Sequence, residues 1–127
     1  MTEIAMERRC SGCDREIEIV LKRDGTAAKT QFGNARRGTV DRQFVSSITV
    51  SAFDDLAKMI ASDRFFDLLD EYRDPATADG EWIKTTVTAG PRRKSVVSRD
   101  GKAPAGLRAL EARIDEMANA LSWRERR

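Results

Sequence analysis

The strongest constraint on the fold is a local plan that occurs twice: two strands joined by a tight turn, followed by an amphipathic helix. In residues 16–22 the apolar side chains alternate with a period of two, which predicts a half-buried strand. Asp24-Gly25 follows at once and is typical of a two-residue hairpin turn. Residues 27–32 are predicted to be the returning strand, so the first half begins with a β-hairpin.

A third strand and a helix follow this hairpin. Residues 40–50 are rich in β-branched and aromatic side chains, which favours a strand. Ser51 and Asp54 then form a pair similar to a capping box, and apolar residues begin to recur at helical spacing. We predict a helix from about Ala52 into the early sixties of the sequence.

The second half repeats the plan. Residues 82–89 have the composition of a strand, Gly90-Pro91 marks a turn, and residues 94–98 return. Pro104 suits the first turn of a closing helix. The apolar stripe of that helix consists of Leu107, Leu110, Ile114, Met117 and Leu121. It spans only about two heptads, so it predicts packing against a core rather than a coiled-coil seam.

Half-buried strands and helices with one apolar stripe must bury those surfaces against one another. We therefore predict an α+β fold: a two-layer sandwich in which an antiparallel, meandering sheet of hairpins carries two amphipathic helices on one face. A length of 127 residues is typical of one domain with its own core, so residues 1–127 are predicted to form a single domain. The sequence has no stretch of membrane-spanning length and no signal-peptide pattern, which predicts a soluble, cytoplasmic protein.

The chain contains no histidine. Its own residues therefore cannot form a Ser-His-Asp or Cys-His catalytic arrangement, and they cannot offer imidazole to a metal. Phosphate-binding glycine loops, nucleophile elbows and dinucleotide fingerprints are also missing from the sequence. We predict no catalytic, cofactor-binding or metal-binding residues, although a site built from carboxylates alone stays open.

Cys10 and Cys13 lie close together among several arginines. Nearby cations favour a thiolate, so the pair could serve thiol redox chemistry, and a dimer could pool two pairs into a zinc site. A redox Cys-x-x-Cys motif commonly lies at a helix N-terminus, whereas this pair precedes a predicted strand. We interpret it mainly as a tight turn that can close a local disulfide.

Two basic clusters are predicted at loop or hairpin ends, where they could contact phosphates. Their members are Arg36, Arg37, Arg92, Arg93 and Lys94. Proteins that bind nucleic acid usually add a strongly basic balance or exposed aromatic residues, for which Trp82 and Phe32 are the candidates here. With 23 basic and 21 acidic residues the net charge is only +2, so weak nucleic-acid binding is an alternative and not the expected function.

The order of several short motifs is similar to a known family. A Cys-Ser-Gly-Cys turn precedes a strand and an Asp-Gly hairpin, Phe65-Phe66 follows the first helix, and Gly-Lys-Ala-Pro opens the last one. In this order, from about Cys10 to Trp123, the chain resembles the bacterial domain-of-unknown-function family 6438. Members tend to carry a cysteine motif that is one residue longer and ends in proline, where this chain has Asp14. The resemblance implies a bacterial protein and a shared fold, and transfers no function.

Charge is distributed unevenly along the chain. Residues 1–53 carry a net charge of +2, residues 54–81 carry −6, and residues 82–127 carry +6. Opposed segments of this kind commonly neutralise each other in the fold, and they can also dock a polar partner. Together with the missing catalytic motifs, this predicts a non-enzymatic domain that binds another protein or associates with itself, and no membrane partner.

Overall fold

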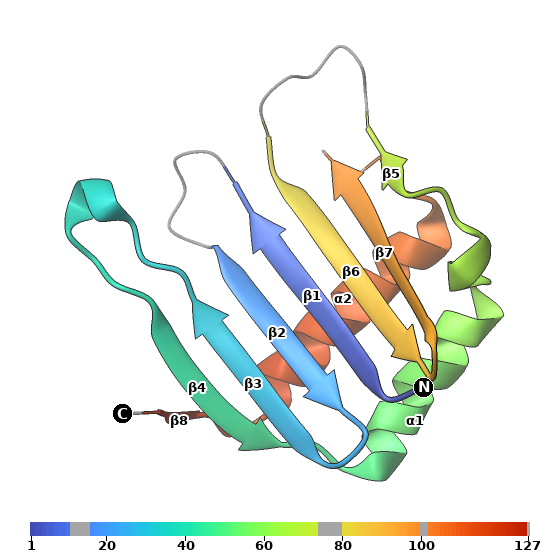
Figure 1. The fold of residues 1–127 in the computed structure, drawn as a ribbon, viewed down its shortest axis with the longest axis horizontal. Helices are drawn as coiled ribbons and strands as arrows, with labels where there is room; N and C mark the ends of the chain where they lie inside the picture. The colour runs from blue at the N-terminus through green and yellow to red at the C-terminus, as the bar shows by residue number, and fades with distance from the viewer. Residues whose placement is uncertain (11–15, 74–79, 100–101, 127) are drawn as a thin grey trace.

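The computed structural model describes residues 1–10, 16–73, 80–99 and 102–126, and in these residues eight strands form one sheet (Figure 1). The order across the sheet is β5-β7-β6-β1-β2-β3-β4-β8. The strands are β1 (Glu3–Arg9), β2 (Ile17–Lys22), β3 (Thr26–Gln31), β4 (Arg42–Ser47), β5 (Glu71–Tyr72), β6 (Trp82–Ala89), β7 (Arg92–Arg99) and β8 (Arg124–Glu125). The helices are α1 (Val50–Ser62) and α2 (Ala105–Ala120), with short 3₁₀ turns η1 (Ala35–Arg37) and η2 (Phe65–Asp67). The predicted α+β class is confirmed.

Strands β1 to β4 are antiparallel neighbours in chain order, and β6 lies on the other side of β1. The pairing of β5 with β7 is parallel, which departs from the predicted all-antiparallel sheet. The hairpins β2–β3 and β6–β7 were predicted. β1 was not, although it lies in the middle of the sheet, with Ile4 and Met6 almost completely buried.

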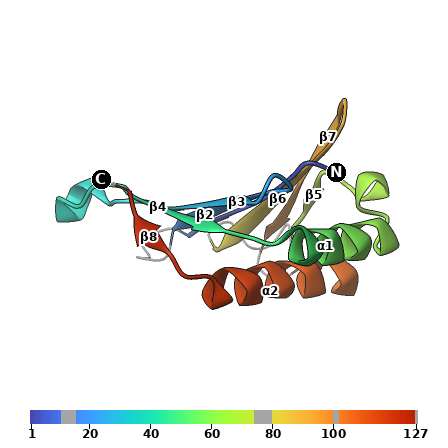
Figure 2. The same ribbon diagram turned by 90° about the horizontal axis from the view of Figure 1, so that it is seen from below.

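Both helices lie on the same side of the sheet (Figure 2). The apolar faces of α1 and α2 meet the inward side chains of β1, β2, β6 and β7 in one core. Its largest members include Ile4, Leu21, Val87, Phe53, Leu56, Leu107 and Leu110. The apolar stripe of α2 thus packs against the core, as its spacing predicted. Among the described residues, none of the helices is long and apolar enough to cross a membrane.

The helix ends differ in detail from the prediction. Thr49 is the N-cap of α1, and its hydroxyl accepts a hydrogen bond from the Ala52 amide at 3.1 Å. The capping pair predicted at Ser51 is therefore wrong: α1 begins at Val50, and β4 ends at Ser47 rather than at residue 50. Serine and threonine can both act as N-caps, and the hydrogen bond from the Ile48 amide to the Gly25 carbonyl places the turn one residue before Thr49.

Candidate functional site

A pocket of about 510 Å³ lies at the ends of β1 to β4, beside the loop of residues 33–41. Its floor is one row of residues across four neighbouring strands, because the strand register aligns Arg8, Ile17, Gln31 and Arg42. Figure 1 shows neither helix behind the η1 end of β3 and β4. The residues that line the pocket come from β1 to β4 and the segments beside them, and from neither helix.

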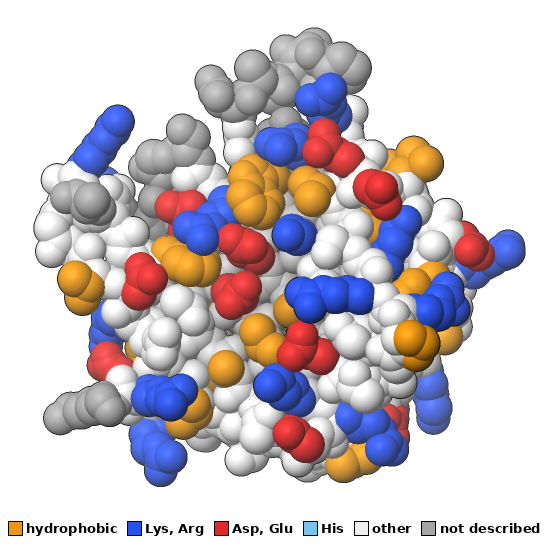
Figure 3. All heavy atoms as spheres, in the orientation of Figure 1, with side chains coloured by type: hydrophobic (Ala, Val, Ile, Leu, Met, Phe, Trp, Pro, Cys, Tyr) orange, Lys and Arg blue, Asp and Glu red, His pale blue; other side chains and the backbone are white. Residues whose placement is uncertain are grey.

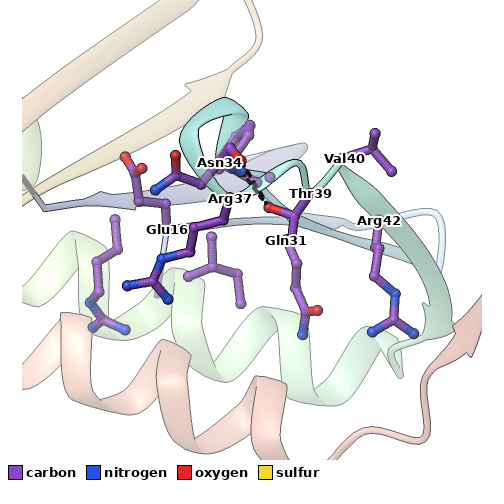
Figure 4. Close-up of a pocket in the computed structure, with 11 residues that line it drawn as sticks. Glu16, Gln31, Asn34, Arg37, Thr39, Val40 and Arg42 are labelled. Carbon is purple, nitrogen blue, oxygen red and sulfur yellow. Dashed lines mark hydrogen bonds between the residues drawn. The ribbon is translucent and has the colours of Figure 1, made fainter. Parts of the chain in front are cut away.

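Polar side chains converge on the pocket from separate elements. Arg8 comes from β1, Arg42 from β4, and Arg37 from η1, and all three line the pocket. In Figure 4 the side chains of Gln31, Arg37 and Arg42 extend in the same direction from the sheet and η1, whereas Val40 points away from them. Three arginines thus line one small volume, together with the amides of Gln31 and Asn34 and the carboxylate of Glu16.

The loop that carries Arg37 is held by its own hydrogen bonds. The Asn34 carbonyl accepts from the amides of Arg37 and Thr39 at 3.0 and 3.1 Å, and the Asn34 amide donates to the Thr39 hydroxyl at 2.6 Å. The Gly33 amide donates to Oδ1 of Asp41 at 2.8 Å and closes the base of the loop. A loop backbone ordered in this way reduces the conformational entropy that is lost when Arg37 binds a ligand.

Arg8 and Arg42 both hold carboxylates of the chain itself. Arg8 donates from Nη2 and Nη1 to the two oxygens of Asp115 on α2, at 2.6 and 3.3 Å. Arg42 donates from Nε and Nη2 to the two oxygens of Glu125, both at 2.9 Å. These hydrogen bonds raise the pKa of each guanidinium above its usual value, so both stay charged. Paired parallel hydrogen bonds are the geometry with which arginine recognises carboxylates.

A buried carboxyl group lies behind Arg8. Glu111 on α2 is only 7 % exposed, and this burial raises its pKa to about 7, against a hydrogen bond from Ser98 and the charge of Arg8, which lower it. Sequence reasoning missed Glu111. Its position four residues after Leu107 and three before Ile114 places it on the apolar face of α2, and that spacing was available as a signal.

The structure separates the two basic clusters that the sequence singled out. Arg37 lines the pocket, and Arg36 on the same 3₁₀ turn does not. Arg92 and Arg93 pair with the far end of β6, which lies beside the start of β1, whereas the pocket lies at the Arg8 end. Lys94 is engaged elsewhere, donating to the Leu68 carbonyl at 2.6 Å and to Asp70 at 2.9 Å.

The two aromatic candidates lie near one end of the sheet, outside the core. Neither Trp82 nor Phe32 packs against the core cluster, and the guanidinium of Arg9 lies 3.5 Å from the centre of the Phe32 ring. Arg9 is also paired with Glu7 at 2.8 Å and with Glu16 at 3.4 Å. Figure 3 shows basic and acidic side chains interspersed on the face without helices, so this face offers no field of a single sign.

Of the predicted thiol pair, the structure describes Cys10. Cys10 is disulfide-bonded, and Cys13 lies outside the described residues. In the ranges that the structure describes, no group of three or more cysteine, aspartate or glutamate side chains could hold a metal ion.

Comparison with known proteins adds no family to these observations. No family model matches the chain, and no curated protein matches its sequence. The resemblance to family 6438 stays a prediction.

Proposed function

We propose that this chain is a non-enzymatic binding domain that recognises an acidic segment of a protein partner in the pocket beside η1. The observation that carries the proposal is the convergence of Arg8, Arg37 and Arg42, from three separate elements, on one volume together with the Gln31 amide. Convergent polar groups in a preformed concave site are the usual mark of a binding site.

The surroundings of the arginines favour a carboxylate attached to a peptide. The paired hydrogen bonds of Arg8 and Arg42 to acidic side chains match carboxylate geometry. Ile17, in the floor row between Arg8 and Gln31, also lines the pocket and offers apolar contact to the aliphatic part of a peptide. An acidic side chain flanked by apolar groups fits both features.

Nucleic acid fits this site less well than a protein does. Single strands are held by a continuous basic groove that follows many phosphates. Here Glu16 lines the same pocket, and the second basic cluster lies at the other end of the strands. A polyanion crossing the face of the sheet that carries no helices would also meet Glu7 and Glu18.

The adjacent arginines of η1 provide a matched test. Arg36 and Arg37 are both exposed, and only Arg37 lines the pocket. We expect Arg37→Ala to weaken binding of a capped peptide of alternating valine and glutamate by about tenfold, the loss typical of a charge-assisted hydrogen bond. Calorimetric titration at low salt measures the affinity.

Arg36→Ala removes the same charge and is expected to change the affinity by less than about twofold, within the effect of an exposed charge. Equal losses in the two variants would mean that the peptide responds only to net charge. Tighter binding of single-stranded DNA than of the peptide, with a steep salt dependence, would support the nucleic-acid alternative instead.

A further inference from the structure

The outer edge of β4 is covered by a very short strand. β8 comprises only Arg124 and Glu125, which pair with Val45 and Phe44, and the next amide, that of Arg126, donates to the Gln43 carbonyl at 2.7 Å. Toward the other end of β4, residues 45–47 and 120–122 line a groove of about 490 Å³, and the Ser46 hydroxyl donates to the Ser122 carbonyl there at 2.7 Å. β8 therefore covers only part of an edge that a longer strand could follow.

β8 also places a carboxylate on the pocket. Glu125 lies opposite Phe44, and Arg42 lies two residues before Phe44 on the same face of β4, within reach of this diagonal neighbour. Both oxygens of Glu125 accept hydrogen bonds from Arg42 at 2.9 Å. An acidic residue of the chain's own extended segment, Glu125, is thus bound by Arg42 of the proposed binding site.

The side-chain contact between β8 and Arg42 is exposed. The side chains of Arg42 and Glu125 are 57 % and 33 % exposed, and pairs of this kind stabilise a protein only slightly. Trp123, just before β8, has separate anchors: its indole donates to the Ala118 carbonyl at 2.8 Å, and Lys29 Nζ lies 4.8 Å from its ring centre. These anchors of Trp123 are separate from the pairing of β8 with β4.

We propose that β8 occupies the place of the partner: an extended, acidic segment of another protein displaces β8, pairs with the edge of β4 and sets its own carboxylate on Arg42. Addition of a strand to a sheet edge is an established mode of peptide recognition, in which the main chain gives affinity and side-chain sites give specificity. This inference rests on the proposed function and names the form in which the acidic segment binds.

The test compares Glu125→Ala with Glu116→Ala in the full chain. Glu116 is an exposed glutamate of α2 whose ion-pair partner is Arg113, at 3.6 Å, so its loss changes the net charge equally. We expect Glu125→Ala to bind the capped valine-glutamate peptide about three- to tenfold more tightly than the wild type, and Glu116→Ala to bind it as the wild type does. A peptide N-methylated at alternate residues is expected to lose binding, since strand addition needs its amides.

The outcomes separate this inference from the proposed function. Arg37-dependent binding that neither Glu125→Ala nor N-methylation alters would overturn strand addition and leave the proposed function standing. A wild type and a Glu125→Ala variant that both fail to bind the peptide would overturn both. Concentration-dependent dimerisation of Glu125→Ala in sedimentation would contradict a separate partner and make a second copy of the chain the occupant.

Discussion

Replacing Glu111 by glutamine is expected to raise the free energy of unfolding at pH 8 by about 3 kcal/mol. Glu111 is 7 % exposed, and burial raises its pKa from an ordinary value of 4.5 to about 7. Each unit of pKa difference between the folded and unfolded states corresponds to about 1.4 kcal/mol. Glutamine keeps the shape of the side chain and removes the charge that is costly to bury above pH 7.

The sign of the pH dependence follows from the raised pKa. Between about pH 4.5 and pH 7 the folded state binds more protons at Glu111 than the unfolded state does, so stability falls as the pH rises. The stability that the folded state gains from protonated Glu111 is fully present below pH 4.5 and is lost as the pH rises through 7. Urea unfolding of the wild type and Glu111→Gln at pH 4.5, 6 and 8 measures the difference between them.

Glu116→Gln, on the exposed side of α2, is the control and is expected to follow the wild type at every pH. The groups around Glu111 that modulate its pKa are Ser98 on β7, Arg8 on β1, and Asp115 and Arg108 on α2. Curves for the wild type and Glu111→Gln that stay parallel from pH 4.5 to 8 would show that Glu111 does not titrate in this window.

Replacing Gly33 by alanine is expected to cost about 2 to 3 kcal/mol and to abolish peptide binding. A methyl group at Gly33 would lie 2.5 to 2.6 Å from backbone atoms of Thr39 and Val40, closer than a Cβ atom comes to a non-bonded heavy atom. The two sides of the 33–41 loop would have to separate, as overpacked sites do at this cost. That movement breaks the loop that places Arg37. Thermal unfolding and peptide titration measure the two effects.

Gly38→Ala in the same loop is the matched comparison. Its added methyl group meets nothing within 4 Å, and its φ of +69° makes alanine strained by about 1 kcal/mol. We expect a smaller loss of stability in this variant and retained peptide binding. A Gly33→Ala variant as stable as the wild type would mean that the close approach of the two loop sides is not required.

The sequence predicted the elements whose signals are local. Residues 82–89 have the composition of a strand and form β6 with those bounds, and the period of α2 indicated its buried stripe. β1 was missed although its two core positions, Ile4 and Met6, have the same period-two spacing as the apolar residues of β2. β5 and β8 are two residues long and exist only through their neighbours in the sheet, so no local pattern could reveal them.

The pocket depends on register, which the sequence alone did not define. Arg37 was a candidate because it stands in a basic pair beside a turn. Arg8 and Arg42 are far apart in the sequence and become neighbours of one pocket only through the pairing of four strands. The 33–41 loop likewise depends on contacts between its two ends, such as that of Gly33 with Asp41.

The binding of a carboxylate between Arg37 and Arg42 is tested most directly by NMR titration of the full chain with the capped valine-glutamate peptide at constant ionic strength. The signals to follow are the Nε–H groups of Arg8, Arg37 and Arg42, the Gln31 side-chain amide and the backbone amides of residues 33–41. The Nε–H groups of Arg92 and Arg93 serve as the reference. We predict saturable shifts in these pocket groups and in the backbone amides of the paired strands β4 and β8, with the side chains of Arg92 and Arg93 unchanged. Shifts that do not saturate and that affect the arginines at both ends of the sheet equally would contradict a binding site in this pocket.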